Sequence, residues 1–381
     1  MNRVLVIFII ILAWPLSALA RGSGPTTLGA NGNAVSFIRP FASKSVWNTP
    51  VANLPGISFT PLGTELNGFT VDISPWIRAG WVGIYYARSS DPTVKLYYNP
   101  NTWTNIANGI WKISGNSPTV EAEITAGVTT AWGGYTFNQY STADVTGSTH
   151  TAPPGYHPQQ SYYWTPTPKV PISAIPAPGA DSHIAVFQPN GWVLETMGTI
   201  RMSNGNIVCM YASFTWSYSN GSGFQNGRRA SMISNYAGVI RNGELTSGTI
   251  SHAMSVDIGQ NALKRQINWP AYSVDMNNRY TGTIPYGALL ALPPNLNIAT
   301  MGLKTPFGRA IAKAAKIYGM YVVDASSTNE FIINSEVAAS DLPAYTWSEQ
   351  CDLTAIVHAL QLVTFTAGTD ADPILPTSSL H

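Results

Sequence analysis

The chain has 381 residues, and only 20 of them are basic and 19 acidic. This sparse and balanced charge argues against nucleic acid as a partner, because phosphate pairing with basic side chains supplies most of that affinity. It argues less strongly against an acidic glycan, since a local basic groove can exist within a neutral total.

The first twenty residues have the pattern of an export signal. Arg3 provides a short positive start, residues 4–13 form an apolar run too short to span a bilayer, and residues 18–20 fit the small-x-small cleavage site. We expect a secreted or periplasmic protein with no membrane segment after cleavage; an uncleaved anchor is the alternative. Removing residues 1–20 takes away one base and no acid, so the mature chain is neutral.

Residues 21–381 are predicted to form a single large, mostly β domain. Short apolar runs rich in aromatic and β-branched residues, such as residues 81–86 and 207–211, alternate with Gly, Pro and Asn turns. This pattern is typical of a sandwich-like or jelly-roll-like fold. Cys209 and Cys351 are the only cysteines, and they could form one disulfide or remain two thiols.

The clearest change in composition lies at about residues 141–180, where eight prolines fall between Pro153 and Pro178. Such a stretch tends to run extended outside a central strand. We expect a loop internal to the domain, with a linker between two domains as the alternative. Tyr162 and Trp164 lie within it, and we expect them to be exposed and to stack on sugar rings.

Residues 184–187 and 192–197 flank a Pro-Asn-Gly turn and are predicted to form a β-hairpin. The register of this hairpin decides where Glu195 points. A two-residue loop puts Glu195 opposite Val186, whereas a three-residue loop puts it opposite Ala185, on the other face of the sheet.

Asp181 and His183 are two residues apart, so on one strand they share a face. In the three-residue register Glu195 joins them, and an acid and an imidazole meet in an aromatic environment. Burial there would raise the pKa of a carboxyl group towards the range of a general acid. The alternatives are that Asp181 caps a turn and that His183 bonds a backbone carbonyl.

Arg241, Glu244 and His252 form a second candidate group. Glu195 and Glu244 could provide the two carboxylates of a glycosidase, with Arg241 and His252 binding the substrate. Alternatively, Arg241 and Glu244 are a surface ion pair across a turn, and His252 bonds a backbone carbonyl. The chain has no recognised metal or cofactor motif, and we expect neither.

Two helices are predicted at the periphery of the domain. The first spans residues 306–318, with Thr305 as its N-cap and Gly319 at its C-terminal end, and a strand follows at once. The second spans residues 349–362, with Ser348 as its N-cap. Both carry apolar residues at the spacing of a buried helix face.

Several short segments occur in an order that resembles a group of secreted bacterial proteins of uncharacterised activity: residues 41–50, 181–186, 194–195, 238–244, 248–253 and 318–324. The group has a W-N-T opening, a D-x-H strand, a Y-E strand end, a G-L-[VI]-R-x-x-E turn, a G-x-I-x-H-A strand and a Y-G-M-x-V-x-D segment. The chain differs at Leu194, where the group often has Tyr, and at Asn242 and Gly243, where it often has Tyr-Asp. The resemblance covers about residues 40–330 and implies one continuous unit, without implying an activity.

These features predict a carbohydrate-active enzyme, with a glycoside hydrolase on a neutral polysaccharide as the leading hypothesis. Its catalytic residues would be Glu195, Glu244, His183 and Asp181. The first alternative is a polysaccharide lyase that uses His183 or a tyrosine as base and Arg241 to neutralise a uronate. The second is a non-catalytic glycan-binding or envelope protein.

Overall fold

The computed structural model describes residues 27–28, 34–35, 41, 45–73, 82–98, 130–131, 168–174, 176–177, 181–189, 193–202, 205–209, 211–215, 227, 229–241, 243–271, 273–274, 279–326, 329–336 and 346–366. The expected export signal and most of the Pro-rich stretch, including Tyr162 and Trp164, lie outside these residues. In the part of the chain so described, no helix is both long and apolar enough to cross a membrane.

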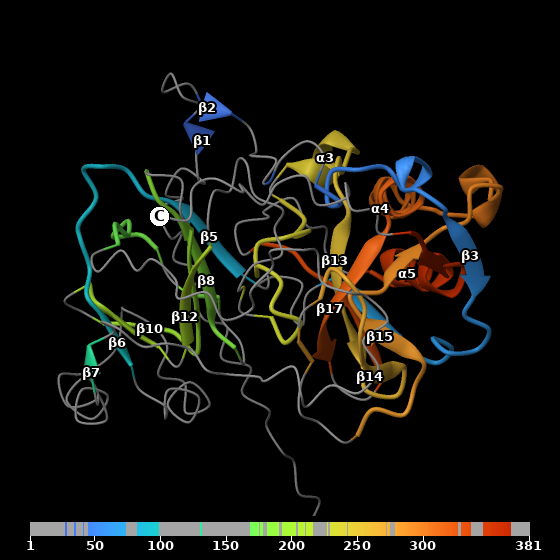
Figure 1. Ribbon diagram of the computed structural model, residues 1–381. Helices are drawn as coiled ribbons and strands as arrows, with labels where there is room; N and C mark the ends of the chain where they lie inside the picture. Colours follow the sequence, from blue (N-terminus) through green and yellow to red (C-terminus); the bar gives the residue numbers. More distant parts are fainter. Residues whose placement is uncertain are drawn as a thin grey trace, which may run out of the picture.

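The mostly β expectation is confirmed, and the described strands form several sheets that all remain open. The largest sheet contains, in spatial order, β3 (Ser58–Pro61), β19 (Gln361–Thr364), β16 (Leu289–Ala291), β17 (Met320–Ser326), β13 (Met254–Gly259), β18 (Glu330–Ile333) and β4 (Thr70–Ile73). A second sheet contains β12 (Tyr211–Thr215), β9 (Val193–Met197), β8 (His183–Phe187) and β5 (Val82–Tyr86). In Figure 1 the two sheets occupy different halves of the molecule.

The remaining strands form smaller sheets. One contains β10 (Ile200–Arg201), β11 (Ile207–Cys209), β6 (Leu96–Tyr98) and β7 (Thr130–Ala131); the others pair β14 (Leu263–Ile267) with β15 (Ile284–Tyr286) and β1 (Thr27–Leu28) with β2 (Ala34–Val35). The described helical segments are η1 (Val51–Asn53), α3 (Glu244–Ser247), η3 (Ile298–Met301), α4 (Pro306–Ile317) and α5 (Trp347–His358).

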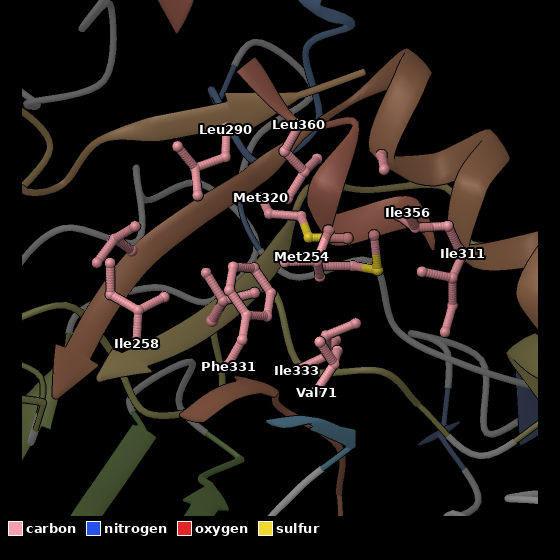
Figure 2. Packing of buried hydrophobic residues seen from close by; sticks show 14 of the residues in the cluster. Val71, Met254, Ile258, Leu290, Ile311, Met320, Phe331, Ile333, Ile356 and Leu360 are labelled. Atoms are coloured by element: carbon pink, nitrogen blue, oxygen red, sulfur yellow. The ribbon is translucent and has the colours of Figure 1, made fainter. Parts of the chain in front are cut away.

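The largest sheet is buried on both faces, because alternate residues of its strands enter different apolar clusters. On one face Met320 and Phe331 pack towards Ile311 of α4 and Ile356 of α5, as Figure 2 shows. On the other face Tyr321 packs in a cluster that also contains residues of β5, β8 and β9. The second cluster therefore joins the largest sheet to the second sheet.

The helix α4 confirms the sequence expectation in detail. Thr305 caps its N-terminus by accepting a hydrogen bond from the Gly308 backbone N–H at 2.9 Å. Pro306 occupies the first turn, where its missing N–H is not needed. Gly319 follows the helix with a φ of 78°, a conformation that glycine adopts without steric cost, and the chain then enters β17.

The helix α5 begins earlier than expected, and Ser348 is not its N-cap. Thr346 caps it instead, in a capping box with Glu349. Glu349 at the third helical position can reach back to the Thr346 backbone N–H, and Ser348 has no such partner in the first turn. The helix ends at His358, so of the expected last turn residues 359–360 form the connection and residues 361–362 begin β19. Cys209 and Cys351 are not joined by a disulfide.

Candidate active site

The β8–β9 hairpin has the register that places Glu195 beside His183. Ala185 pairs with Glu195 and Phe187 pairs with Val193, as expected from the three-residue loop. The side chains of Glu195 and His183 therefore lie on the face of the second sheet that is turned towards the largest sheet, where Ala185 and Val193 pack in the shared cluster.

Asp181, His183, Asn235 and Glu195 form a line of polar contacts that runs from the surface into the interior. Asp181 is partly exposed, and its Oδ2 lies 3.6 Å from His183 Nε2. His183 Nδ1 lies 3.4 Å from the side-chain amide nitrogen of Asn235, and the Asn235 backbone N–H donates to Glu195 Oε2 at 2.8 Å. Glu195 has no exposed surface. We call these four residues the polar line.

The contact with Asn235 orients the ring of His183. With the amide nitrogen of Asn235 beside Nδ1, the other ring nitrogen, Nε2, faces Oδ2 of Asp181. The side chain of Asp181 therefore lies beside His183, rather than only capping a turn. The polar line offers a partly exposed carboxylate backed by an oriented imidazole.

A buried ion pair from the largest sheet meets the polar line. Arg229 Nη1 lies 3.5 Å from Oδ2 of Asp257 on β13, and Arg229 Nη2 donates to the Asn235 carbonyl at 3.3 Å. Asn334 donates to Asp257 Oδ1 at 3.0 Å. Burial raises the pKa of Asp257 to about 6, and the charge of Asp181 adds to that rise, against the opposing effects of Arg229 and Asn334.

Glu244 and Arg241 belong to a second network, around the short helix α3. Glu244 Oε2 accepts from the Arg241 backbone N–H at 2.8 Å and from His252 Nε2 at 3.1 Å. The Arg241 guanidinium donates from Nε to Glu336 at 3.0 Å and from Nη2 to the hydroxyl of Tyr86 at 2.9 Å. Because Arg241 and Glu244 are both buried, the alternative of a surface ion pair is wrong.

The surroundings of His252 favour its charged form. Its Nδ1 lies 2.9 Å from the Ala253 carbonyl oxygen and its Nε2 lies 3.1 Å from Glu244 Oε2, so both ring nitrogens face oxygen atoms. Burial lowers the pKa of His252, but Glu244 and the Ala253 carbonyl outweigh this, and the net pKa is raised. The network thus places two basic side chains, His252 and Arg241, against two acidic ones, Glu244 and Glu336.

The hydrogen bonds therefore place Glu195 and Glu244 in two separate networks, and their use as one acid pair remains a prediction. The networks are adjacent through β5, because Val82 pairs with His183 on one side and forms a bridge with Glu336 on the other.

Sequence reasoning missed several members of these networks: Asp257, Arg229, Asn235, Tyr86 and Glu336. Asp257 had a usable signal, because it interrupts the apolar residues 253–258 much as Glu195 interrupts its own strand. Glu336 had no such signal.

Comparison of the chain with known protein families, with curated proteins and with solved structures finds no match. The resemblance to secreted bacterial proteins therefore remains a prediction. Within the described residues, no three His, Cys, Asp or Glu side chains gather closely enough to hold a metal ion.

Proposed function

We propose that the protein is an exported carbohydrate-active enzyme that hydrolyses a neutral polysaccharide by carboxylate acid–base chemistry. The observation that carries the proposal is the polar line, which connects a partly exposed carboxylate, Asp181, to the buried acid Glu195 through His183 and Asn235. The low total charge and the abundance of aromatic residues support a neutral sugar as substrate.

Glycoside hydrolysis needs one carboxyl group that holds a proton and another that is ionised. Burial raises the pKa of Asp257 to about 6, but Asp257 is as buried as Glu195, so in this proposal it acts on the polar line through Arg229 and does not touch the sugar. Asp181 suits the second of these roles, because its side chain is 29% exposed and can reach a sugar. Glu195 is fully buried, so in this proposal it is a positioning residue that holds Asn235 and, through it, His183.

The test is a panel of bacterial and plant polysaccharides assayed for new reducing ends. On a cleaved glycan, Asp181→Asn should lower kcat by at least about 100-fold, the usual contribution of a general acid or base. Glu195→Gln should lower kcat and also shift the pH profile, which a purely structural role would not do. Glu330→Gln, a matched change on β18, should leave both unchanged.

The hydrolase proposal fails if Glu195→Gln and Asp181→Asn leave activity unchanged on every glycan that the wild-type protein cleaves. Binding to an insoluble polysaccharide without release of reducing ends would instead select the non-catalytic glycan-binding role. In that case Tyr162 and Trp164, rather than the carboxylates, should control the affinity.

One observation favours a lyase as the second candidate. The hydroxyl of Tyr86 accepts a hydrogen bond from Arg241, and a guanidinium at 2.9 Å stabilises a phenolate that could remove a proton. Lyase products carry a new double bond and absorb in the ultraviolet, whereas hydrolase products do not. Tyr86→Phe should then abolish the ultraviolet signal while the ring continues to stack on Phe187.

The proposal also includes a sandwich-like or jelly-roll-like arrangement of the sheets. It is supported by two apolar clusters, each of which draws its residues from two sheets.

A further inference from the structure

Arg201 is a buried arginine that lacks a charged partner. It lies on β10, its side chain is 1% exposed, and Nη2 donates a long hydrogen bond of 3.3 Å to the Pro171 carbonyl. Among the described residues, its Nε and Nη1 have no hydrogen-bond partner and no carboxylate forms an ion pair with it. Burial lowers the pKa of Arg201 to about 10, against a smaller opposing effect of Tyr85.

The other buried arginines in the described residues each have a carboxylate partner. Arg229 lies against Asp257, and Arg241 lies against Glu336. A buried guanidinium without an anion has lost most of its hydration, and one long hydrogen bond to a carbonyl replaces only part of it. Arg201 therefore indicates that an anion from outside the described residues completes its surroundings.

The cover over the guanidinium is thin. Pro171 and Gly205 are only partly buried, and Ile172, next in the chain, is 77% exposed. Gly205 has a φ of 85°, and the nearest atom to the position of a Cβ there would be Arg201 Nη2 at 3.9 Å. Among the described residues, a Cβ at Gly205 would meet no other atom within 4 Å, so this turn places no side chain over the guanidinium.

We propose that Arg201 anchors a binding site for an organic carboxylate, such as that of a uronic acid. The planar guanidinium presents paired N–H groups that match the two oxygens of a carboxylate. Pro171 and Ile172 add an apolar surface that suits the ring of a sugar acid better than a fully hydrated phosphate. The site goes beyond the proposed function and does not depend on it, since its test measures binding rather than cleavage.

The test compares thermal unfolding of the wild-type full chain and Arg201→Met with sodium glucuronate, glucose and inorganic phosphate, at equal ionic strength set with NaCl. Without ligand, Arg201→Met should unfold about 2 °C higher than the wild type, because it replaces an uncompensated charge by an apolar side chain of similar length. As a matched control, the variant Arg229→Met, which removes a buried arginine that has a carboxylate partner, should unfold at a lower temperature than the wild type.

Glucuronate should raise the unfolding temperature of the wild type but not that of Arg201→Met, and glucose should affect neither. If Arg201→Met does not fold, Arg201→Lys is tested instead, because it keeps the positive charge but lacks the paired N–H groups of a guanidinium. Glucuronate should then raise the unfolding temperature of Arg201→Lys less than that of the wild type. The proposal is overturned if glucuronate does not raise the unfolding temperature of the wild type, or if it raises the unfolding temperatures of the wild type and of the Arg201 variants equally. It is also overturned if only phosphate raises the unfolding temperature of the wild type. A lower unfolding temperature for Arg201→Met overturns the argument from uncompensated charge.

Discussion

At the scale of single residues, Asp257 shows how burial can outweigh an ion pair. The guanidinium of Arg229 is 3.5 Å away and Asn334 donates a hydrogen bond, yet the pKa of Asp257 is raised to about 6. The lost hydration of the carboxylate is the largest cause, and the nearby charge of Asp181 acts in the same direction.

This shift makes the stability of the protein depend on pH. A carboxyl group with a raised pKa in the folded state stabilises the fold fully below its unfolded pKa of about 3.8, and this contribution is lost as the pH rises through about 6. Urea unfolding from pH 4 to 7 should show the free energy of unfolding of the wild type falling relative to Asp257→Asn, by up to about 3 kcal/mol.

Asp181→Asn provides the control for that experiment. Removing the charge of Asp181 lowers the pKa of Asp257, so the loss of stability should be smaller and should be complete at a lower pH. If the difference in unfolding free energy between the wild type and Asp257→Asn does not change over this pH range, Asp257 has no raised pKa.

At the scale of elements, the ends of the helices follow from hydrogen bonds between neighbouring residues. The first helix could be predicted almost completely, because Thr305, Pro306 and Gly319 each have one dominant conformational preference. The start of α5 was harder to predict, because Thr346 and Ser348 are both good N-cap residues. The position of Glu349 decides in favour of Thr346, since a capping box needs a Glu at the third helical position.

The two hydroxyl residues can be told apart by mutation. Thr346→Ala should lower the free energy of unfolding by about 1 kcal/mol, because it removes the cap of α5. Ser348→Ala, at a residue inside the first turn, should change it by less than about 0.5 kcal/mol. Chemical denaturation of both variants measures the difference; equal effects would contradict the capping box.

The β8–β9 hairpin marks the limit of what its sequence could predict. The alternation of residues gave both strands, but the register depended on the conformation of the loop, and two loop lengths fitted the same residues. The pairing of Ala185 with Glu195 is selected by packing. In this register Val193 enters the cluster shared with the largest sheet, whereas Leu194 enters the cluster on the opposite face.

At the scale of the whole molecule, the two main sheets are tied together by charged and polar side chains as well as by apolar packing. Arg241 connects Tyr86 at the end of β5 to Glu336 just beyond β18. The backbone bridge between Val82 and Glu336 lies at the same junction. Loss of one charge here leaves the other buried and unbalanced, which costs more than the loss of a surface ion pair.

Glu336→Gln should therefore lower the free energy of unfolding by about 3 kcal/mol, because the charge of Arg241 loses its main partner. Tyr86→Phe removes only the hydrogen bond from the Arg241 guanidinium to an uncharged hydroxyl and should cost about 1.5 kcal/mol. Urea titration gives both values. A smaller effect for Glu336→Gln than for Tyr86→Phe would show that the ion pair does not hold the junction.

The order of the strands in the largest sheet could not be predicted from the sequence. Local patterns indicate that a strand exists, but the partner of each strand depends on contacts between distant segments. The seven strands come from residues 58–73 and 254–364, and parallel and antiparallel pairs are mixed. For the same reason the meeting of Asp257 with the polar line could not be predicted.

The position of β19 between β3 and β16 has a consequence for how the chain can be made. The hydroxyls of Ser58 and Thr364 meet at 2.6 Å, although 306 positions separate them. A growing polypeptide on the ribosome cannot complete this sheet until the segment that contains Thr364 has been made, so β3 remains without its neighbour while the intervening residues are synthesised. Stop codons shortly before residue 361 should yield aggregating products, because they leave two unprotected strand edges facing solvent.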